Sequence, residues 1–410
     1  MFDRREFLKA SASGFALGAT GSASAALWAA DGVLGPAGLP SGALESALLD
    51  ALPGKQPLIK KSFRPPNYET PLPYLDEAFT PNDAFFVRYH LANIPQVDAT
   101  SWKLSVGGEA ADKPFALTLE QLKREYEPVE VAALCLCSGN RRGLSDPHVP
   151  GVQWGYGAMG NAKWKGARLT DVLARTGIKK DAVEVVFDGA DGPVLEKTPD
   201  FLKSIPLWKA TDENTILAYE MNGEPLPHWN GFPVRVVVPG WTATYWMKHV
   251  TSIQLVSQPF KGFWMVSAYR IPKGKFPVVD RFLSQETDVN TPITEMVVSS
   301  LITNLHDGSV LPAGKPAVVR GVAWDGGYGI RDVEVSIDGG RSWRPAELGL
   351  ELGRFAWRQW SYGIDPPQPG NYTVMAKATN RVGASQTFEL VFNPAGYHNN
   401  VVQRLNVKVA

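Results

Sequence analysis

The alternation of apolar and polar positions predicts a chain rich in short strands. Residues 102–106 alternate as a half-buried strand does, and the apolar run 129–136 has the composition of a buried strand. A further buried strand is predicted at 232–238, where Pro239-Gly240 marks the turn that closes it. Such strands alternate with helical segments up to about residue 279, which indicates a mixed α+β domain.

Two short helices are predicted inside this domain. Residues 118–126 begin with Thr118 in the N-cap position and carry Gln121 three residues later, a pairing typical of a helix start. The second helix, 169–175, is ended by Gly177.

The pattern changes after about residue 291, where short strands follow one another with turns between them. Asp338-Gly339-Gly340 is typical of a hairpin turn. Regularly spaced short strands predict an all-β sandwich of immunoglobulin type. The strands expected there are 300–303, 317–322, 330–337 and 371–379. We therefore expect a first domain at 34–290, which includes an N-terminal arm, and a second at 291–410.

Residues 1–33 predict an export signal that is not part of the fold. Arg4-Arg5 stands as in a twin-arginine signal, and a stretch rich in Ala, Gly and Ser follows it. This stretch is too weakly apolar for a stable membrane span, and no other run approaches ~18 apolar residues. We expect a cleaved signal and export of the folded protein to the periplasm.

Composition and charge exclude some classes of function. Lys plus Arg number 41 and Asp plus Glu number 41, so the net charge is zero at pH 7. This balance gives no support for a protein that binds nucleic acid or an anionic membrane surface. The six histidines are scattered without the spacing of a metal site.

The run from Cys137 to Arg142 carries the strongest chemical signal. A thiolate is a ligand for soft or high-valent transition metals, and a guanidinium clamps oxyanions with paired hydrogen bonds. Gly139 lies between the two and allows the backbone to turn. We expect a redox-active metal beside a bound oxyanion.

The chain has two cysteines, Cys135 and Cys137. Residues i and i+2 of an extended strand lie ~6.6 Å apart, near the outer limit for a disulfide. We therefore expect Cys137 to remain a free ligand and Cys135 to be a core residue.

Several ordered motifs resemble the sulfite oxidase family of molybdenum enzymes, most closely its periplasmic bacterial sulfite dehydrogenases. The motifs are 85–90, 137–142, 164–173, 217–223, 231–240 and 338–343. The resemblance covers nearly all of the chain after the signal. It implies an α+β fold, with a mixed α/β molybdopterin domain followed by an immunoglobulin-like dimerisation domain.

The resemblance also implies roles for single residues. Cys137 would coordinate molybdenum, and three arginines would line the substrate pocket: Arg88, Arg142 and Arg358. Tyr269 would hydrogen-bond the oxyanion or a metal-bound oxygen, and His90 would orient Arg88 or the cofactor.

A larger set is expected to hold the molybdopterin cofactor by resemblance. Its members are Phe86, Val87, Arg88, Tyr89, His90, Cys137, Asp191, Asn230, Arg235, Trp246, Met247 and Lys248. Arg235 and Lys248 suit the charge of the cofactor phosphate. Asn230 departs from vertebrate members, which have a histidine at that position.

By resemblance, the expected activity is periplasmic oxidation of sulfite to sulfate at a molybdenum–pterin centre. The sequence has no Cys-x-x-Cys-His haem motif, so we expect electrons to pass to a separate c-type cytochrome. The expected assembly is a homodimer or a heterodimer with a cytochrome subunit.

Other interpretations remain open. In one alternative, a protein with this same scaffold oxidises a protein-bound sulfane sulfur or reduces a sulfoxide. A nitrate reductase shares the scaffold, but the export signal and the missing haem and flavin domains count against it. A non-enzymatic periplasmic binding protein belongs to a different class, and metal analysis would distinguish it.

Overall fold

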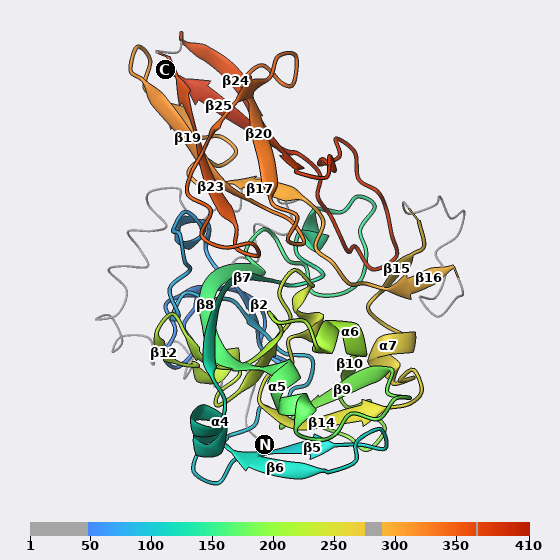
Figure 1. The fold of residues 1–410 in the computed structure, drawn as a ribbon. Helices are drawn as coiled ribbons and strands as arrows, with labels where there is room; N and C mark the ends of the chain where they lie inside the picture. The colour runs from blue at the N-terminus through green and yellow to red at the C-terminus, as the bar shows by residue number, and fades with distance from the viewer. Residues whose placement is uncertain (1–47, 275–288, 366–367) are drawn as a thin grey trace, which may run out of the picture. The chain divides into compact units, whose positions relative to one another are not determined.

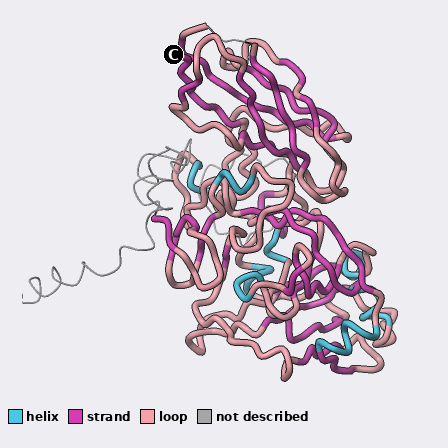
Figure 2. The backbone as a smooth tube through the Cα atoms, turned by 90° about the vertical axis from the view of Figure 1, so that its left-hand side faces the viewer, coloured by secondary structure: helices cyan, strands magenta, loops and turns pink. Residues whose placement is uncertain are grey.

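The computed structural model describes residues 48–274, 289–365 and 368–410. Strands and loops dominate these residues, and the helices are few and short (Figure 1, Figure 2). The predicted twin-arginine signal lies outside the described residues. Among the residues described, no helix combines the length and the apolar character needed to cross a bilayer.

The N-terminal arm contributes strands to the first sheet. Its strand order is β1-β2-β3-β4, and all neighbours are antiparallel. The bounds are β1 Leu48–Asp50, β2 Leu58–Ser62, β3 Asn67–Glu69 and β4 Val87–Arg88. A 3-10 helix, η1 (Leu72–Leu75), lies between β3 and β4. This sheet positions Arg88.

A second sheet of five strands has the order β10-β9-β14-β5-β6. Its strands are β5 Lys103–Gly107, β6 Phe115–Thr118, β9 Glu184–Gly189, β10 Lys203–Pro206 and β14 Val250–Val256. The predicted N-cap is confirmed at α4 (Leu119–Glu125), because the Thr118 hydroxyl accepts from the Gln121 amide and the Gln121 side chain accepts from the Thr118 amide. The other helices are α5 Leu169–Ala174, α6 Leu207–Ala210 and α7 Phe263–Val266.

A third sheet carries the cysteine run. Its order is β12-β11-β8-β7, and β13 also pairs with β11. The bounds are β7 Pro128–Leu136, β8 Met159–Arg168, β11 Ile216–Met221, β12 Glu224–Pro225 and β13 Arg235–Val237. Short 3-10 turns follow: η2 Arg142–Leu144, η3 His228–Asn230 and η4 Ala243–Tyr245. The predicted strand at 232–238 is shorter than expected because residues 232–234 stay outside the ladder.

The C-terminal residues form the predicted sandwich. One sheet has the order β17-β19-β23-β22 and the other β18-β25-β24-β20-β21. The first contains β17 Ser299–Ile302, β19 Ala317–Trp324, β22 Glu347–Leu348 and β23 Arg358–Ile364. The second contains β18 Val310–Leu311, β20 Ile330–Ser336, β21 Arg344–Pro345, β24 Gly370–Asn380 and β25 Gln403–Val409. In β25, buried and exposed positions alternate strictly, as in a strand with one face on a core.

A two-stranded sheet, β15 (Arg270–Pro272) and β16 (Asn290–Pro292), precedes the sandwich. The sandwich has its own apolar core, which includes Val319, Val333 and Trp360. The second and third sheets share a larger core that includes Cys137. The first sheet has a small core of its own, with Leu58, Tyr68 and Val87. The described residues all belong to one compact unit.

Candidate functional site

Cys137 stands at the point where β7 leaves its sheet. Its amide donates to the Ala158 carbonyl at 2.9 Å, which continues the pairing of β7 with β8 by one residue. The chain then turns tightly, because the Asn140 amide donates to the Cys137 carbonyl at 3.0 Å. Arg141 takes a left-handed φ of 68°, which reverses the backbone before Arg142. Both cysteine thiols are free and buried.

Arg141 fastens this turn to the sandwich. Its Nη2 donates to the Ser300 carbonyl at 2.6 Å, and its Nη1 donates to the Val401 carbonyl at 3.2 Å. The guanidinium is buried and lies over the rings of Tyr156 and Trp324. A buried cation is costly unless its donors are satisfied, so these carbonyls fix the cysteine turn in place.

The first cavity lies directly beside Cys137. It is lined by several separate stretches of the chain, and Tyr269 is part of its wall. Most of the residues expected to hold the cofactor also line it: Phe86, Arg88, His90, Cys137, Asp191, Asn230, Arg235, Trp246, Met247 and Lys248. Val87 and Tyr89 do not line it; Val87 is packed in the core, and the Tyr89 hydroxyl contacts His249 Nε2 at 2.7 Å.

Unpaired polar atoms around this cavity fit a polar ligand such as a pterin. Three lining side chains have buried atoms without a hydrogen-bond partner: Ser138 Oγ, Thr244 Oγ1 and Arg235 Nε. Buried polar groups are normally paired, so such atoms call for an explanation. The other Arg235 nitrogens are used, since they donate to the carbonyls of Asn230 and Trp246 at 2.9 and 3.1 Å.

The cavity is positively charged on one side. Lys248 is buried, and burial lowers its pKa to about 7, while the carboxylate of Asp191 opposes that shift. Its Nζ donates to the Arg88 carbonyl and lies over the Tyr89 ring. Lys248 and Arg235 both line this cavity, and their contact with the cofactor phosphate stays a prediction.

Lys55 of the N-terminal arm contacts two residues that line the cavity, Phe85 and Asn230. Its Nζ donates to Asn230 Oδ1 at 2.6 Å and to the carbonyls of Asn82 and Phe85 at 2.6 and 3.0 Å. The Asn230 amide nitrogen donates to the Phe86 carbonyl at 3.2 Å. Asn230 is thus held by protein groups on both sides, and sequence reasoning missed Lys55 because it lies 175 residues away.

Arg88, Tyr269 and His90 form one hydrogen-bonded group. Arg88 Nη2 donates to the Tyr269 hydroxyl at 3.2 Å, and that hydroxyl also contacts His90 Nε2. The pKa of His90 is well below its usual value, because of burial and then of the nearby cations Arg88, Lys248 and Lys203. Burial also raises the pKa of the Tyr269 hydroxyl. With His90 and Tyr269 both neutral, the Arg88 guanidinium carries the charge of this group.

Two further residues support this group from behind. The Phe201 ring stacks on His90 with centroids 3.5 Å apart. Lys203 is fully buried, donates to the Trp264 carbonyl at 2.7 Å, and lies 5.1 Å from the Tyr269 ring centroid. Tyr269 itself has a left-handed φ of 57°, a conformation that costs a non-glycine residue about 1–3 kcal/mol and is found at functional sites.

A second cavity of about 500 Å³ adjoins the first and shares Arg88, Cys137 and Tyr269 with it. Arg142 lines it and is held by the Ala395 carbonyl, which accepts from Nε at 2.7 Å. Tyr397 stacks on Tyr269 with centroids 5.6 Å apart and lies 5.3 Å from the Arg142 guanidinium.

The structure does not bring Arg358 to this site, which corrects the expectation of a third pocket arginine. Arg358 begins β23, its Nε donates to the Gly349 carbonyl at 2.9 Å, and it lines a separate cavity. The C-terminal stretch supplies Pro394, Ala395 and Tyr397 instead.

The architecture and the two cavities define a molybdopterin-binding oxidoreductase. Residues 90–264 match the oxidoreductase molybdopterin binding domain, and residues 290–410 match the Mo-co oxidoreductase dimerisation domain. The chain belongs to the sulfite oxidase family.

Named relatives support this assignment. Human mitochondrial sulfite oxidase is 34% identical over 376 residues, which cover 87% of this chain and 67% of the relative. Sulfite oxidase of Arabidopsis thaliana is 32% identical over 384 residues, covering 87% of this chain and 95% of the relative. The sulfane dehydrogenase SoxCD of Paracoccus pantotrophus has a similar structure, with a TM-score of 0.72, 25% identity and 90% coverage of both chains. The predicted fold and family are confirmed.

Proposed function

We propose that this protein oxidises sulfite to sulfate and passes the electrons to a c-type cytochrome. The observation that carries the proposal is the meeting of Cys137, Arg88, Arg142 and Tyr269 where the two cavities join. A bound molybdenum cofactor supplies the two-electron oxidation there. The net reaction converts sulfite and water to sulfate, two protons and two electrons.

The chain's own residues would hold the reactants. Cys137 offers its thiolate to the metal, and Arg235, Lys248 and Asn230 surround the pterin. Arg88 and Arg142 attract the oxyanion, and their charge is already in place before the substrate arrives, which is electrostatic preorganisation. Substrate is held from one side by Arg88 and the Tyr269 hydroxyl and from the other by Arg142.

The location and assembly belong to the same proposal. The twin-arginine pattern supports export of a folded, cofactor-loaded protein to the periplasm, where a c-type cytochrome would accept electrons. The dimerisation domain supports a homodimer, or a heterodimer with a cytochrome subunit.

The test is sulfite-dependent reduction of ferricyanide and of cytochrome c by the purified protein. The Cys137→Ser variant should lose turnover and the molybdenum-dependent absorption, while Cys135→Ser should keep both to a much larger degree. Sulfite turnover by Cys137→Ser at the wild-type rate would contradict the proposal.

A second candidate is oxidation of sulfane sulfur carried by a larger molecule. The cavity volume of about 500 Å³ exceeds what one sulfite ion needs, and Arg358 is absent from its wall. The similarity to a sulfane dehydrogenase also favours it. A synthetic peptide persulfide, assayed beside sulfite with ferricyanide, distinguishes the two: the substrate with the higher kcat/KM identifies the reaction.

A further inference from the structure

Three tryptophans connect the cofactor cavity with the protein surface. Trp246 lines the cavity, and its Nε1 donates to the Trp241 carbonyl at 3.1 Å. The Trp241 ring contacts the Trp208 ring edge-on, with centroids 5.8 Å apart. Trp246 and Trp241 are buried, whereas Trp208 is 63% exposed. The chain of contacts is unbroken from the cavity to solvent.

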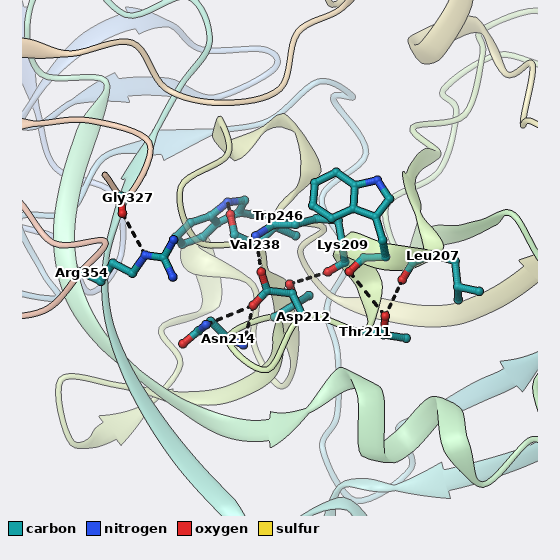
Figure 3. Close-up of polar contacts among 11 residues, drawn as sticks. Leu207, Lys209, Thr211, Asp212, Asn214, Val238, Trp246, Gly327 and Arg354 are labelled. Carbon is teal, nitrogen blue, oxygen red and sulfur yellow. Dashed lines mark hydrogen bonds and ion pairs between the residues drawn. The ribbon is translucent and has the colours of Figure 1, made fainter. Parts of the chain in front are cut away.

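The surrounding hydrogen bonds hold these side chains in place (Figure 3). Trp246 Nε1 also donates to the Val238 carbonyl at 2.8 Å. Trp208 lies on α6, where Lys209 forms an ion pair with Asp212 at 3.0 Å and the Thr211 hydroxyl donates to the Leu207 carbonyl at 2.9 Å. The buried Lys209 Nζ lies 6.0 Å from the Trp241 ring. The indoles are therefore fixed relative to one another.

We propose that these indoles are the route by which electrons leave the cofactor, and that Trp208 is the contact point for a one-electron haem protein. The inference rests on the proposed function, since sulfite oxidation releases two electrons. Each electron passes to a separate acceptor haem, which is reduced from ferric to ferrous, and no tryptophan is left oxidised. The route has two steps: a hydrogen bond from the Trp246 indole to the Trp241 backbone carbonyl, and a ring contact between Trp241 and Trp208. Such direct contacts couple donor and acceptor better than a solvent-filled gap.

The surface character of Trp208 fits such an encounter. A single exposed apolar residue is ordinary on a protein surface. Trp208 differs because, among the described residues, it is the one tryptophan that is largely exposed, and it touches the buried chain. Redox partners use small interfaces, and tryptophan often supplies most of the binding energy at an interface.

A competing route runs through α7. Phe263 is 44% exposed, contacts Trp264, and Trp264 contacts His90. Trp264 also lines the substrate cavity, however, so an acceptor seated there would compete with substrate. The Trp208 route leaves that cavity free, which is why we favour it.

The test compares a protein acceptor with a small one. Trp208→Ala should lower kcat/KM for horse-heart cytochrome c by about tenfold or more, while sulfite-dependent ferricyanide reduction and molybdenum content stay at wild-type values. Phe63→Ala is the matched control, because Phe63 has the same exposed fraction, 63%, and lies outside the chain of indoles. It should change neither rate.

Binding gives a readout independent of turnover. Titration with ferric cytochrome c should quench the exposed component of tryptophan emission in the wild type, and Trp208→Phe should remove that quenching. The proposal is overturned if Trp208→Ala keeps the wild-type rate with cytochrome c, if Phe263→Ala alone lowers it, or if wild-type protein reduces ferricyanide but no cytochrome c. Failure of wild-type protein to oxidise sulfite with ferricyanide would instead contradict the proposed function.

Discussion

Arg88 and Arg142 both line the second cavity, where we propose that the substrate binds. They come from different parts of the fold, and each is held by its own partner. Arg88 reaches the Tyr269 hydroxyl from β4, and Arg142 is anchored on the Ala395 carbonyl. Within the described residues, neither guanidinium hydrogen-bonds or ion-pairs with a carboxylate. Their charge is therefore available to an anion.

Replacing Arg88 by Gln should raise KM for sulfite roughly tenfold to a hundredfold, since hydrogen bonds to a charged group contribute about 1.5–3 kcal/mol. Steady-state kinetics with ferricyanide measure the effect, with molybdenum content determined in parallel. The exposed Arg331→Gln serves as the control. An unchanged KM would remove Arg88 from the substrate pocket.

Tyr397 is a second residue whose role can be tested by substitution, because its ring contacts both Tyr269 and Arg142. Tyr397→Ala should lower kcat/KM for sulfite about tenfold, because an aromatic pair contributes about 0.5–1.5 kcal/mol and the contact with Arg142 adds a cation–π term. Tyr397→Phe keeps both ring contacts and should lose far less. Equal losses in the two variants would show that the hydroxyl, not the ring, matters.

Tyr397 is also a site residue that could not be predicted from the sequence. Cys137, Arg142 and Tyr269 could be assigned because each stands in a local motif, and local spacing is visible in a sequence. Arg358 stands beside two tryptophans in the sequence but faces another cavity, since the register of β23 with β19 decides which side chains point where. Tyr397 and Lys55 reach the site through long-range contacts that no periodicity records.

At the scale of elements, the N-terminal arm supports residues that line the first cavity. Its Lys55 bridges Asn230 and the segment that carries Phe85. Burial lowers the pKa of Lys55 from 10.5 to about 7. The short strands and the capped helix α4 were predictable because they depend on alternation and neighbouring residues, whereas the arm's position depends on tertiary packing.

The shifted pKa of Lys55 predicts a pH-dependent stability. Between about pH 7 and 10.5 the unfolded chain keeps a proton that the folded chain has released, so stability should rise with pH. One proton contributes at most about 1.4 kcal/mol per pH unit.

The measurement is the free energy of unfolding at several pH values for wild type and Lys55→Met. The stability of the wild type relative to Lys55→Met should rise with pH across this window, because the folded wild type has released a proton that its unfolded chain still holds. Exposed Lys163→Met is the control. Parallel curves for wild type and Lys55→Met would contradict the prediction.

At the scale of the whole molecule, the sandwich holds the turn that carries Cys137. Arg141 donates to the Ser300 carbonyl near the start of the sandwich sequence and to the Val401 carbonyl near its end. In return, the Asn399 side-chain amide donates to the Arg141 carbonyl at 3.1 Å. The two family domains therefore meet at the cysteine run.

Replacing Arg141 by Gln should destabilise the protein by about 2–4 kcal/mol, since it leaves buried carbonyls unpaired. It should also lower the amount of molybdenum retained after purification, although Arg141 does not line either shared cavity. Thermal unfolding and metal analysis check this, with Arg331→Gln again as the control. Wild-type metal retention in a destabilised variant would limit Arg141 to a structural role.

The left-handed backbone at Arg141 has a consequence for how such chains can be recombined. Two successive arginines there bind different parts of the C-terminal domain: Arg141 donates to the Ser300 carbonyl. Arg142 lines the second cavity and donates to the Ala395 carbonyl. A chimera that joins the molybdopterin domain of this protein to the dimerisation domain of a relative should therefore fold and be active only if it keeps residues 393–401 of this protein.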